Sequence, residues 1–308
     1  MRVPEALLPL LDAAGPAPAD PAAARSAEEA ASQALVGRVI PSAPDAVRWT
    51  DHDADGVPVR VYTPSDPTGA GLVHAHGGGW TTGSLETVHA PAAAMAEDSG
   101  AVVVSVGYRL IPEHRFPAGV DDLETAFRWT IAHAAALGIH PERCAISGSS
   151  AGGNLAAVVA RRLRDDAGPA PALQLLQGAR LDTGTDGDDW DAARQDVPPL
   201  AAMLTRSVDA YAAAGARADD PDASPLAAAS FEGLPPATIL AGEVDPLRGD
   251  ALAYAHRLID AGVRVELHLI PGVVHGTEEF RLLLPGARDW HRIRCTALRS
   301  LAMTKETP

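Results

Sequence analysis

The sequence has very few cysteines, which excludes two kinds of small stabilised fold. Only Cys144 and Cys295 occur among the 308 residues. A disulfide-stapled domain needs more cysteines than this, and a zinc site needs a ligand spacing that the chain lacks. Cys144 lies in an apolar run expected to form a strand, and Cys295 in a C-terminal segment expected to form a helix. We therefore predict two free, buried thiols.

Long apolar runs and an excess of basic residues are also missing. No apolar stretch approaches the roughly 20 residues that a membrane-spanning helix needs. The net charge is −15, whereas proteins that bind nucleic acid or anionic membranes usually carry a basic surface. Residues 1–5 do not have the composition of a signal peptide. We predict a cytoplasmic protein with no nucleic-acid and no membrane partner.

A regular alternation of apolar strands and amphipathic helices is present instead. Apolar stripes at helical spacing lie near residues 120–131, 150–164 and 247–258. Repeated alternation of this kind indicates an α/β fold with a parallel, doubly wound sheet flanked by helices. The last strand alternates apolar and polar residues, which is typical of a sheet edge, and we include a homodimer paired through that edge among the predictions. Eight strands are expected, at residues 48–50, 57–62, 72–76, 101–106, 144–147, 173–176, 237–241 and 264–270.

Two regions depart from this alternation. Residues 1–46 are rich in alanine and proline and hold two helical stretches, and Ser26 with Glu29 forms a capping-box pattern at the start of the second, which runs to about Val36. Residues 181–216 separate the sixth and seventh strands by far more than a crossover helix requires, and they include a weak helix near residues 200–213. The predicted division is an N-terminal helical segment at 1–46, a core in two parts at 47–180 and 217–308, and an insertion at 181–216.

A serine framed by glycines follows the fifth expected strand. Residues 148–152 read G-S-S-A-G, and a helix that begins with small residues comes next. The G-x-S-x-G pattern lifts a serine out of a strand-to-helix corner, where its hydroxyl can act as a nucleophile. The pattern alone is weak, but this strand and helix are the context that it requires. We predict Ser150 as the nucleophile; the alternatives are a purely structural turn and the neighbouring Ser149.

A second glycine motif, H-G-G-G-W at residues 76–80, follows the third expected strand. Three consecutive glycines cost conformational entropy that a plain connecting loop does not require. They suit a loop whose backbone N–H groups point at a negatively charged ligand oxygen. We predict that the N–H groups of Gly78, Gly79 and Ala151 hold an oxyanion, and a flexible linker is the alternative. Trp80 is expected to pack beneath the site.

A nucleophilic serine of this kind needs an acid and a histidine later in the chain. In this fold the acid follows the seventh strand and the histidine follows the eighth. Asp245 and His275 occupy those two places. The residues that fit these roles less well are Glu243, His52, His114 and His268, the last of which lies within a strand and should point sideways.

Together these motifs resemble the hormone-sensitive-lipase-like carboxylesterases of the α/β-hydrolase superfamily, the bacterial group called family IV. The resemblance implies an α/β-hydrolase fold whose helical cap is formed by residues 1–46 and 181–216. Two positions depart from the family pattern, because Ser149 stands where Asp or Thr is frequent and Thr277 stands where Phe is frequent. Both departures leave the substrate preference open. The matching segments are 76–80, 108–109, 112–118, 148–152, 224–226, 245–248 and 275–276.

The resemblance also implies a reaction, the hydrolysis of short- to medium-chain carboxylic esters through an acyl-enzyme, with a small-molecule ester as the partner. Ser150 would attack the carbonyl, His275 would transfer the proton and Asp245 would orient His275. This mechanism needs no metal or cofactor, and none is expected. Three alternatives remain: an amidase such as an arylformamidase, a true lipase acting on aggregated lipid, and a non-catalytic binding module like the plant gibberellin receptors, which lack the histidine.

Overall fold

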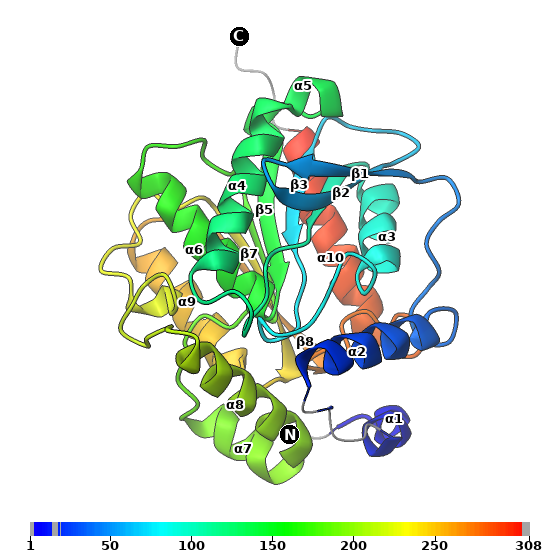
Figure 1. The fold of residues 1–308 in the computed structure, drawn as a ribbon, viewed down its shortest axis with the longest axis vertical. Coiled ribbons are helices and arrows are strands. Elements are labelled where there is room, and N and C mark those ends of the chain that lie inside the picture. The colour runs from blue at the N-terminus through cyan, green and yellow to red at the C-terminus, as the bar shows by residue number, and fades with distance from the viewer. Residues whose placement is uncertain (1–2, 14–17, 19, 304–308) are drawn as a thin grey trace.

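The computed structural model describes residues 3–13, 18 and 20–303, and a sheet of eight strands lies at its centre (Figure 1). The strand order is β1-β2-β4-β3-β5-β6-β7-β8. β2 runs antiparallel to both of its neighbours, and all other neighbouring strands pair in parallel. The eight strands and the mostly parallel α/β fold are therefore confirmed. The strands are Arg48–Ala54 (β1), Val57–Thr63 (β2), Gly71–Ala75 (β3), Val102–Val106 (β4), Cys144–Ser149 (β5), Gln174–Gln177 (β6), Ala237–Val244 (β7) and Val265–Val274 (β8).

Helices cover both faces of the sheet, which explains the continuous apolar runs in its central strands. Val102 and Val104 of β4 belong to the larger apolar core, whereas Val103 faces the second core on the other side. Helices α4, α6 and α9 pack on the first face, and α3 and α10 pack on the second (Figure 1). Within the described part of the chain, no helix is both long and apolar enough to cross a bilayer. These helices are His89–Ser99 (α3), Ala118–Ala132 (α4), Ala151–Asp165 (α6), Arg248–Asp260 (α9) and Pro285–Ala302 (α10), with the short α5 at Ala134–Leu137.

The N-terminal segment and the insertion lie on the same side of the molecule (Figure 1). The insertion forms α7 (Asp188–Asp196) and α8 (Pro198–Ala213), and the N-terminal segment forms α1 (Leu8–Ala13) and α2 (Pro21–Leu35). Val3 packs against Val197 and Ala201 of the insertion. Leu7 is buried against Val244 and Val274, at the carboxyl ends of β7 and β8. The division of the chain into cap and core stays a prediction, and residues 1–2, 14–17 and 19 of the N-terminal segment lie outside the described residues.

The predicted start of α2 is wrong. The helix begins at Pro21, and the Asp20 carboxylate caps it by accepting the N–H of Ala23 at 2.8 Å. Ser26 and Glu29 therefore lie inside the helix and form no capping box. Proline at the first helical position is already set to the helical φ, so the Asp-Pro pair is the stronger start signal.

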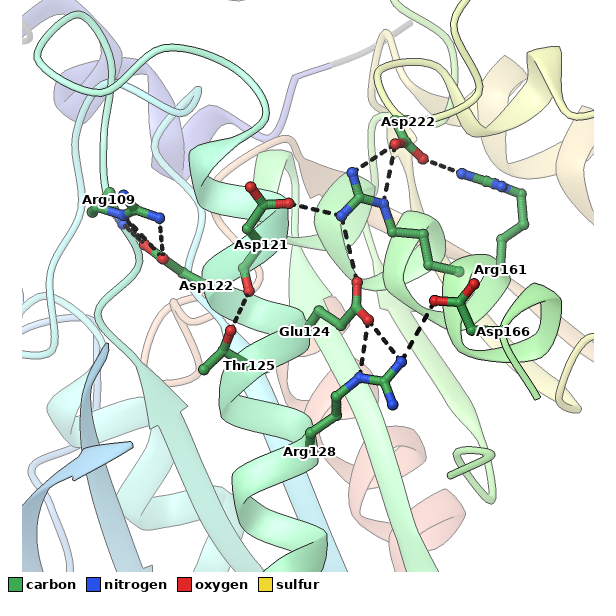
Figure 2. A network of polar contacts seen from close by, with 10 residues as sticks. Arg109, Asp121, Asp122, Glu124, Thr125, Arg128, Arg161, Asp166 and Asp222 are labelled. Carbon is green, nitrogen blue, oxygen red and sulfur yellow. Dashed lines mark hydrogen bonds and ion pairs between the residues drawn. The ribbon is translucent and has the colours of Figure 1, made fainter. Parts of the chain in front are cut away.

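An arginine–carboxylate network ties the segment that follows the insertion to helices α4 and α6 (Figure 2). Asp222 accepts hydrogen bonds from Arg161 and Arg162, both on α6, the helix that follows Ser150. Arg162 also donates to Asp121 of α4 at 2.8 Å. Several charged hydrogen bonds on shared partners hold these three segments in one arrangement. Further pairs in Figure 2 are Arg109–Asp122, Arg128–Glu124 and Arg128–Asp166.

Both cysteines are buried and unpaired, as predicted. Cys144 lies in β5 and Cys295 lies in α10. Burial raises the pKa of the Cys144 thiol to about 12 and that of the Cys295 thiol to about 11. Because the thiolate is the reactive form, both side chains are chemically inert at neutral pH.

Candidate active site

Ser150 occupies a strained turn between β5 and α6. Its backbone has φ 53° and ψ −117°, a conformation that residues other than glycine rarely adopt. The flanking glycines make the turn possible. A Cβ on Gly148 would lie 2.1 Å from the carbonyl carbon of Gly152, and one on Gly152 would lie 2.2 Å from the carbonyl oxygen of Ala75. The G-x-S-x-G spacing is therefore a steric requirement of this turn.

The fold brings Asp245 and His275 to Ser150 from distant parts of the sequence. Ser150 Oγ lies 2.9 Å from His275 Nε2, and His275 Nδ1 lies 3.0 and 3.1 Å from the two carboxylate oxygens of Asp245. The three residues follow β5, β7 and β8, which are parallel, so the carboxyl ends of these strands meet at one edge of the sheet. This arrangement allows the hydroxyl proton to pass to Nε2 while the carboxylate holds Nδ1–H.

The charge of Asp245 controls the basicity of His275. Asp245 is 1 % exposed, and its Oδ1 accepts the N–H of Leu247 at 2.8 Å, which fixes the carboxylate. Burial by itself would lower the pKa of His275, but the charge and hydrogen bond of Asp245 raise this pKa above its ordinary value. His275 is therefore a stronger base than free imidazole.

The glycine loop, residues 76–80, lies beside Ser150. A Cβ on Gly77 would lie 3.5 Å from the Cβ of Ser150, so the loop and the serine are in contact. Gly78 and Gly79 have φ of 116° and 58°. Among the hydrogen bonds of the described residues, none uses the N–H groups of Gly78, Gly79 or Ala151. These donors are free to bind a ligand oxygen, and Ala151 adds the positive end of α6.

Neighbouring segments hold the glycine loop in place. Tyr108 Oη donates to the carbonyl of His76 at 2.9 Å, and its ring stacks on the imidazole of His76. From α2, Arg25 Nε donates to the carbonyl of Thr81 at 2.8 Å, directly after the loop. Trp80 is buried, and its place beneath the site stays a prediction. The N-terminal segment therefore contributes directly to the surroundings of the site.

The sequence patterns did not predict the buried polar groups that support the histidine loop. Glu279, four residues after His275, is bonded by Arg294 of α10, with Nη2 donating at 2.9 Å. Arg294 and Trp290 also donate to the side-chain oxygen of Gln177 at 3.2 and 3.1 Å. In the sequence, the sign of such a group was a charged residue, Arg294, among the apolar residues of α10. The sequence did not show that Arg294 would pair with Glu279, because that contact forms only in the folded chain.

The residues considered as alternative acids and bases make no recorded hydrogen bond to this cluster in the described structure. Glu243 is exposed, and its carboxylate accepts the N–H of Gly272 at 3.3 Å. His268 lies within β8 and His52 within β1. Across the described residues, the structure records no hydrogen bond from any of these side chains to Ser150, and it records no group of three or more His, Cys, Asp or Glu residues that could hold a metal ion. That the reaction needs no cofactor stays a prediction.

Comparisons with known proteins identify the family to which this fold belongs. The family model described as the alpha/beta hydrolase fold matches residues 72–279. The chain is 42 % identical to carboxylesterase NlhH of Mycobacterium tuberculosis over 246 residues, which cover 76 % of this chain and 75 % of that protein. It is 37 % identical to an ethyl acetate hydrolase of Pseudomonas putida over 262 residues, which cover 82 % of this chain and 81 % of that protein.

A solved structure of an esterase from the bacterial hormone-sensitive lipase family extends the similarity over nearly the whole chain. It aligns with a TM-score of 0.85 and 28 % identity, covering 98 % of this chain and 100 % of that one. The relatives named above are hydrolases of carboxylic esters, and the protein is a carboxylic ester hydrolase. With its sheet order and its two glycine motifs, the chain belongs to the hormone-sensitive-lipase-like carboxylesterases, bacterial family IV, of the α/β-hydrolase superfamily.

Proposed function

We propose that the protein hydrolyses short- to medium-chain carboxylic esters through an acyl-enzyme on Ser150, with His275 as general base and acid and Asp245 as its orienting partner. The observation that carries the proposal is the continuous hydrogen-bonded chain from Ser150 through His275 to Asp245. The N–H groups of Gly78, Gly79 and Ala151, which make no recorded hydrogen bond among the described residues, support the proposal. The preference for a small ester is supported by the name of the relative from Pseudomonas putida, an ethyl acetate hydrolase.

The first half of the reaction forms the acyl-enzyme. Ser150 Oγ bonds to the ester carbonyl carbon while its proton passes to His275 Nε2. The carbonyl oxygen becomes an oxyanion, which accepts hydrogen bonds from the N–H groups of Gly78, Gly79 and Ala151. The bond to the alcohol oxygen then breaks, and His275 gives its proton to the departing alcohol.

The second half of the reaction releases the acid. His275 takes a proton from a water molecule, whose oxygen bonds to the acyl carbon. The bond to Ser150 Oγ breaks, and the serine recovers its proton from His275. One ester and one water yield one acid and one alcohol. Asp245 stays ionised in both halves and stabilises the imidazolium ion that forms twice.

The test of this function combines covalent labelling with a substrate series. We expect an organophosphonate to label Ser150, as identified by peptide mass spectrometry. Among p-nitrophenyl esters, kcat/KM should be highest for short to medium acyl chains and fall for long ones. A matched formamide should react more slowly than the ester. A label on another residue, a faster formamide or a preference for emulsified long-chain ester would each contradict the proposal.

Replacing Gly78 should slow the chemical step. A Cβ at this position would lie 2.3 Å from the carbonyl oxygen of Thr82, and its φ of 116° disfavours any side chain. Gly78→Ala must therefore displace the N–H group that the oxyanion needs. Loss of one such donor lowers kcat by a factor of about 10²–10³. We expect a decrease of this size with little change in KM, measured with p-nitrophenyl acetate.

Gly56→Ala is the matched control for the Gly78 variant. Gly56 has a φ of 94°, and an added Cβ would meet no atom within 4 Å. It therefore carries the backbone strain of the substitution without the displacement at the site. Thermal melting of both variants separates misfolding from slow chemistry. A Gly78→Ala defect confined to KM would argue against the oxyanion role.

The pH dependence should follow the His275 pKa. His275 accepts a proton only when it is neutral, and its pKa lies above the ordinary value of 6.5. Activity should therefore be lost as the pH falls, with a midpoint in kcat/KM above 6.5. Asp245→Asn removes the charge that raises this pKa, so the residual activity should persist to lower pH. Rates measured from acid to alkaline pH at constant ionic strength decide this, and a wild-type midpoint below 6.5 would contradict the assignment.

A further inference from the structure

The glycine loop ends in Trp80, and an aromatic side chain of the insertion lies flat against it. Tyr211 of α8 stacks on Trp80 with ring centroids 3.9 Å apart and ring planes 5° apart. Both residues are 3 % exposed. Phe116 meets the ring of Tyr211 edge-on, at 5.4 Å and 89°. These three rings connect the insertion to the loop that carries the oxyanion donors.

The polar atoms of the stacked pair make no contribution to this contact. Tyr211 Oη and Trp80 Nε1 are buried, and neither has a hydrogen-bond partner among the described residues. Both rings line one small pocket together with Tyr108 and Leu155. A buried hydroxyl without a partner is unfavourable. What Tyr211 supplies to this place is therefore its ring.

A second contact from α8 reaches the backbone of the loop. A Cβ on Gly79 would lie only 2.6 Å from the Cβ of Ser207. Ser207 precedes Tyr211 by four residues, so both side chains project from one face of α8. The helix thus touches two consecutive loop residues, Gly79 and Trp80, next to the N–H donors.

The loop backbone needs an external constraint. Gly78, Gly79 and Trp80 have consecutive positive φ values of 116°, 58° and 60°. Glycine makes such a run accessible but also leaves it free to adopt other conformations. A tryptophan in this region is strained, and strained backbone persists only where the surrounding structure holds it. The stack of Trp80 on Tyr211 and the contact of Gly79 with Ser207 provide this constraint.

We infer that Tyr211 is a positioning residue for the oxyanion hole, acting through its stack on Trp80 to keep the glycine loop in the conformation that aims its N–H groups at the substrate. The inference rests on the proposed function, since it assigns a role within the same site. The rate of the chemical step therefore depends on the position of α8. This dependence is separate from any effect of the insertion on substrate access.

Tyr211→Leu is the informative variant, because leucine retains apolar bulk but cannot stack. A complete loss of one oxyanion donor costs about 10²–10³ in kcat, and a loosened loop should cost less, about 10- to 100-fold. We expect this decrease to be equal for p-nitrophenyl acetate and p-nitrophenyl butyrate, with KM little changed. Phosphonylation of Ser150 should slow by a similar factor. Tyr211→Phe retains the ring and should rescue the rate.

Two further variants separate positioning from general damage to the insertion. Asp209→Ala changes an exposed residue of the same helix, and its rates should equal those of the wild type. Ser207→Val adds methyl groups against Gly79, and it should lower kcat even if Tyr211→Leu does not fold.

The outcomes distinguish this inference from the proposed function. Wild-type kcat in Tyr211→Leu, with Gly78→Ala still slow, would overturn the inference alone. Wild-type kcat in Gly78→Ala would remove the oxyanion hole itself. A Tyr211→Leu defect confined to KM, or one that grows with acyl length, would make Tyr211 a wall of the substrate pocket and overturn its positioning role. A large loss in Tyr211→Phe would assign the effect to the hydroxyl and also overturn it.

Discussion

Ser150→Ala should lower kcat by a factor of about 10⁶ while the protein remains folded. The substitution removes the atom that forms the acyl-enzyme, so only substrate binding and the oxyanion donors remain to assist attack by water. The fold loses little, because the recorded side-chain hydrogen bond of Ser150 is the one to His275. Steady-state hydrolysis of p-nitrophenyl acetate measures the rate, and thermal melting measures the fold.

The neighbouring serine is the control for this variant. Ser149 is the last residue of β5 and occupies the position that the G-x-S-x-G pattern leaves unspecified. Ser149→Ala should retain activity and should still be labelled by an organophosphonate, whereas Ser150→Ala should not be labelled. If Ser150→Ala retained its esterase activity and Ser149→Ala lost it, the nucleophile would be misassigned.

His275→Ala should be nearly as damaging as Ser150→Ala, with a decrease in kcat of about 10⁶. Without the imidazole, neither the serine nor the incoming water can lose its proton at neutral pH, and the alcohol leaves unprotonated. Asp245→Asn should cost about 10⁴, because the amide favours the wrong imidazole tautomer and cannot stabilise the imidazolium. The double variant Ser150→Ala/His275→Ala should be no slower than either single variant, because the two groups act as a unit.

The sequence supplies matched controls for both partners. His268 lies on β8, the strand that leads to His275, and Glu243 lies on β7, the strand that leads to Asp245. His268→Ala and Glu243→Gln should retain wild-type kcat, since neither side chain bonds to the cluster in the described structure. If His268→Ala lost activity while His275→Ala kept it, His275 would not be the base. If Glu243→Gln lost activity while Asp245→Asn kept it, Asp245 would not be the acid.

The eight strands could be predicted because their signals are local. Residues 102–106 are four valines and one serine, all buried, because helices cover both sides of the sheet. Local signals gave the wrong start for α2. The Ser26–Glu29 pattern predicted a capping box, but the helix begins earlier, at Pro21, and Asp20 caps it. The homodimer, the cytoplasmic location and the limits of the cap stay predictions.

The positions of Ser150, Asp245 and His275 could be predicted for a related reason. Each follows a strand end, and parallel strands place those ends at a common edge, so chain order is enough to propose the cluster. The glycine spacing could also be predicted from the local sequence, because the turn around Ser150 leaves no room for a Cβ at Gly148 or Gly152.

The supports of the site belong to the folded chain. Arg294 pairs with Glu279, and Tyr211 lies on Trp80, across sequence separations that no repeating pattern marks. Such pairs form wherever folding leaves an unpaired charge or an unfilled space beside a compatible side chain. Hydrophobic periodicity and backbone sterics act over a few residues, so the local sequence determines them. Close packing of side chains depends on all elements together and is decided only by the tertiary structure.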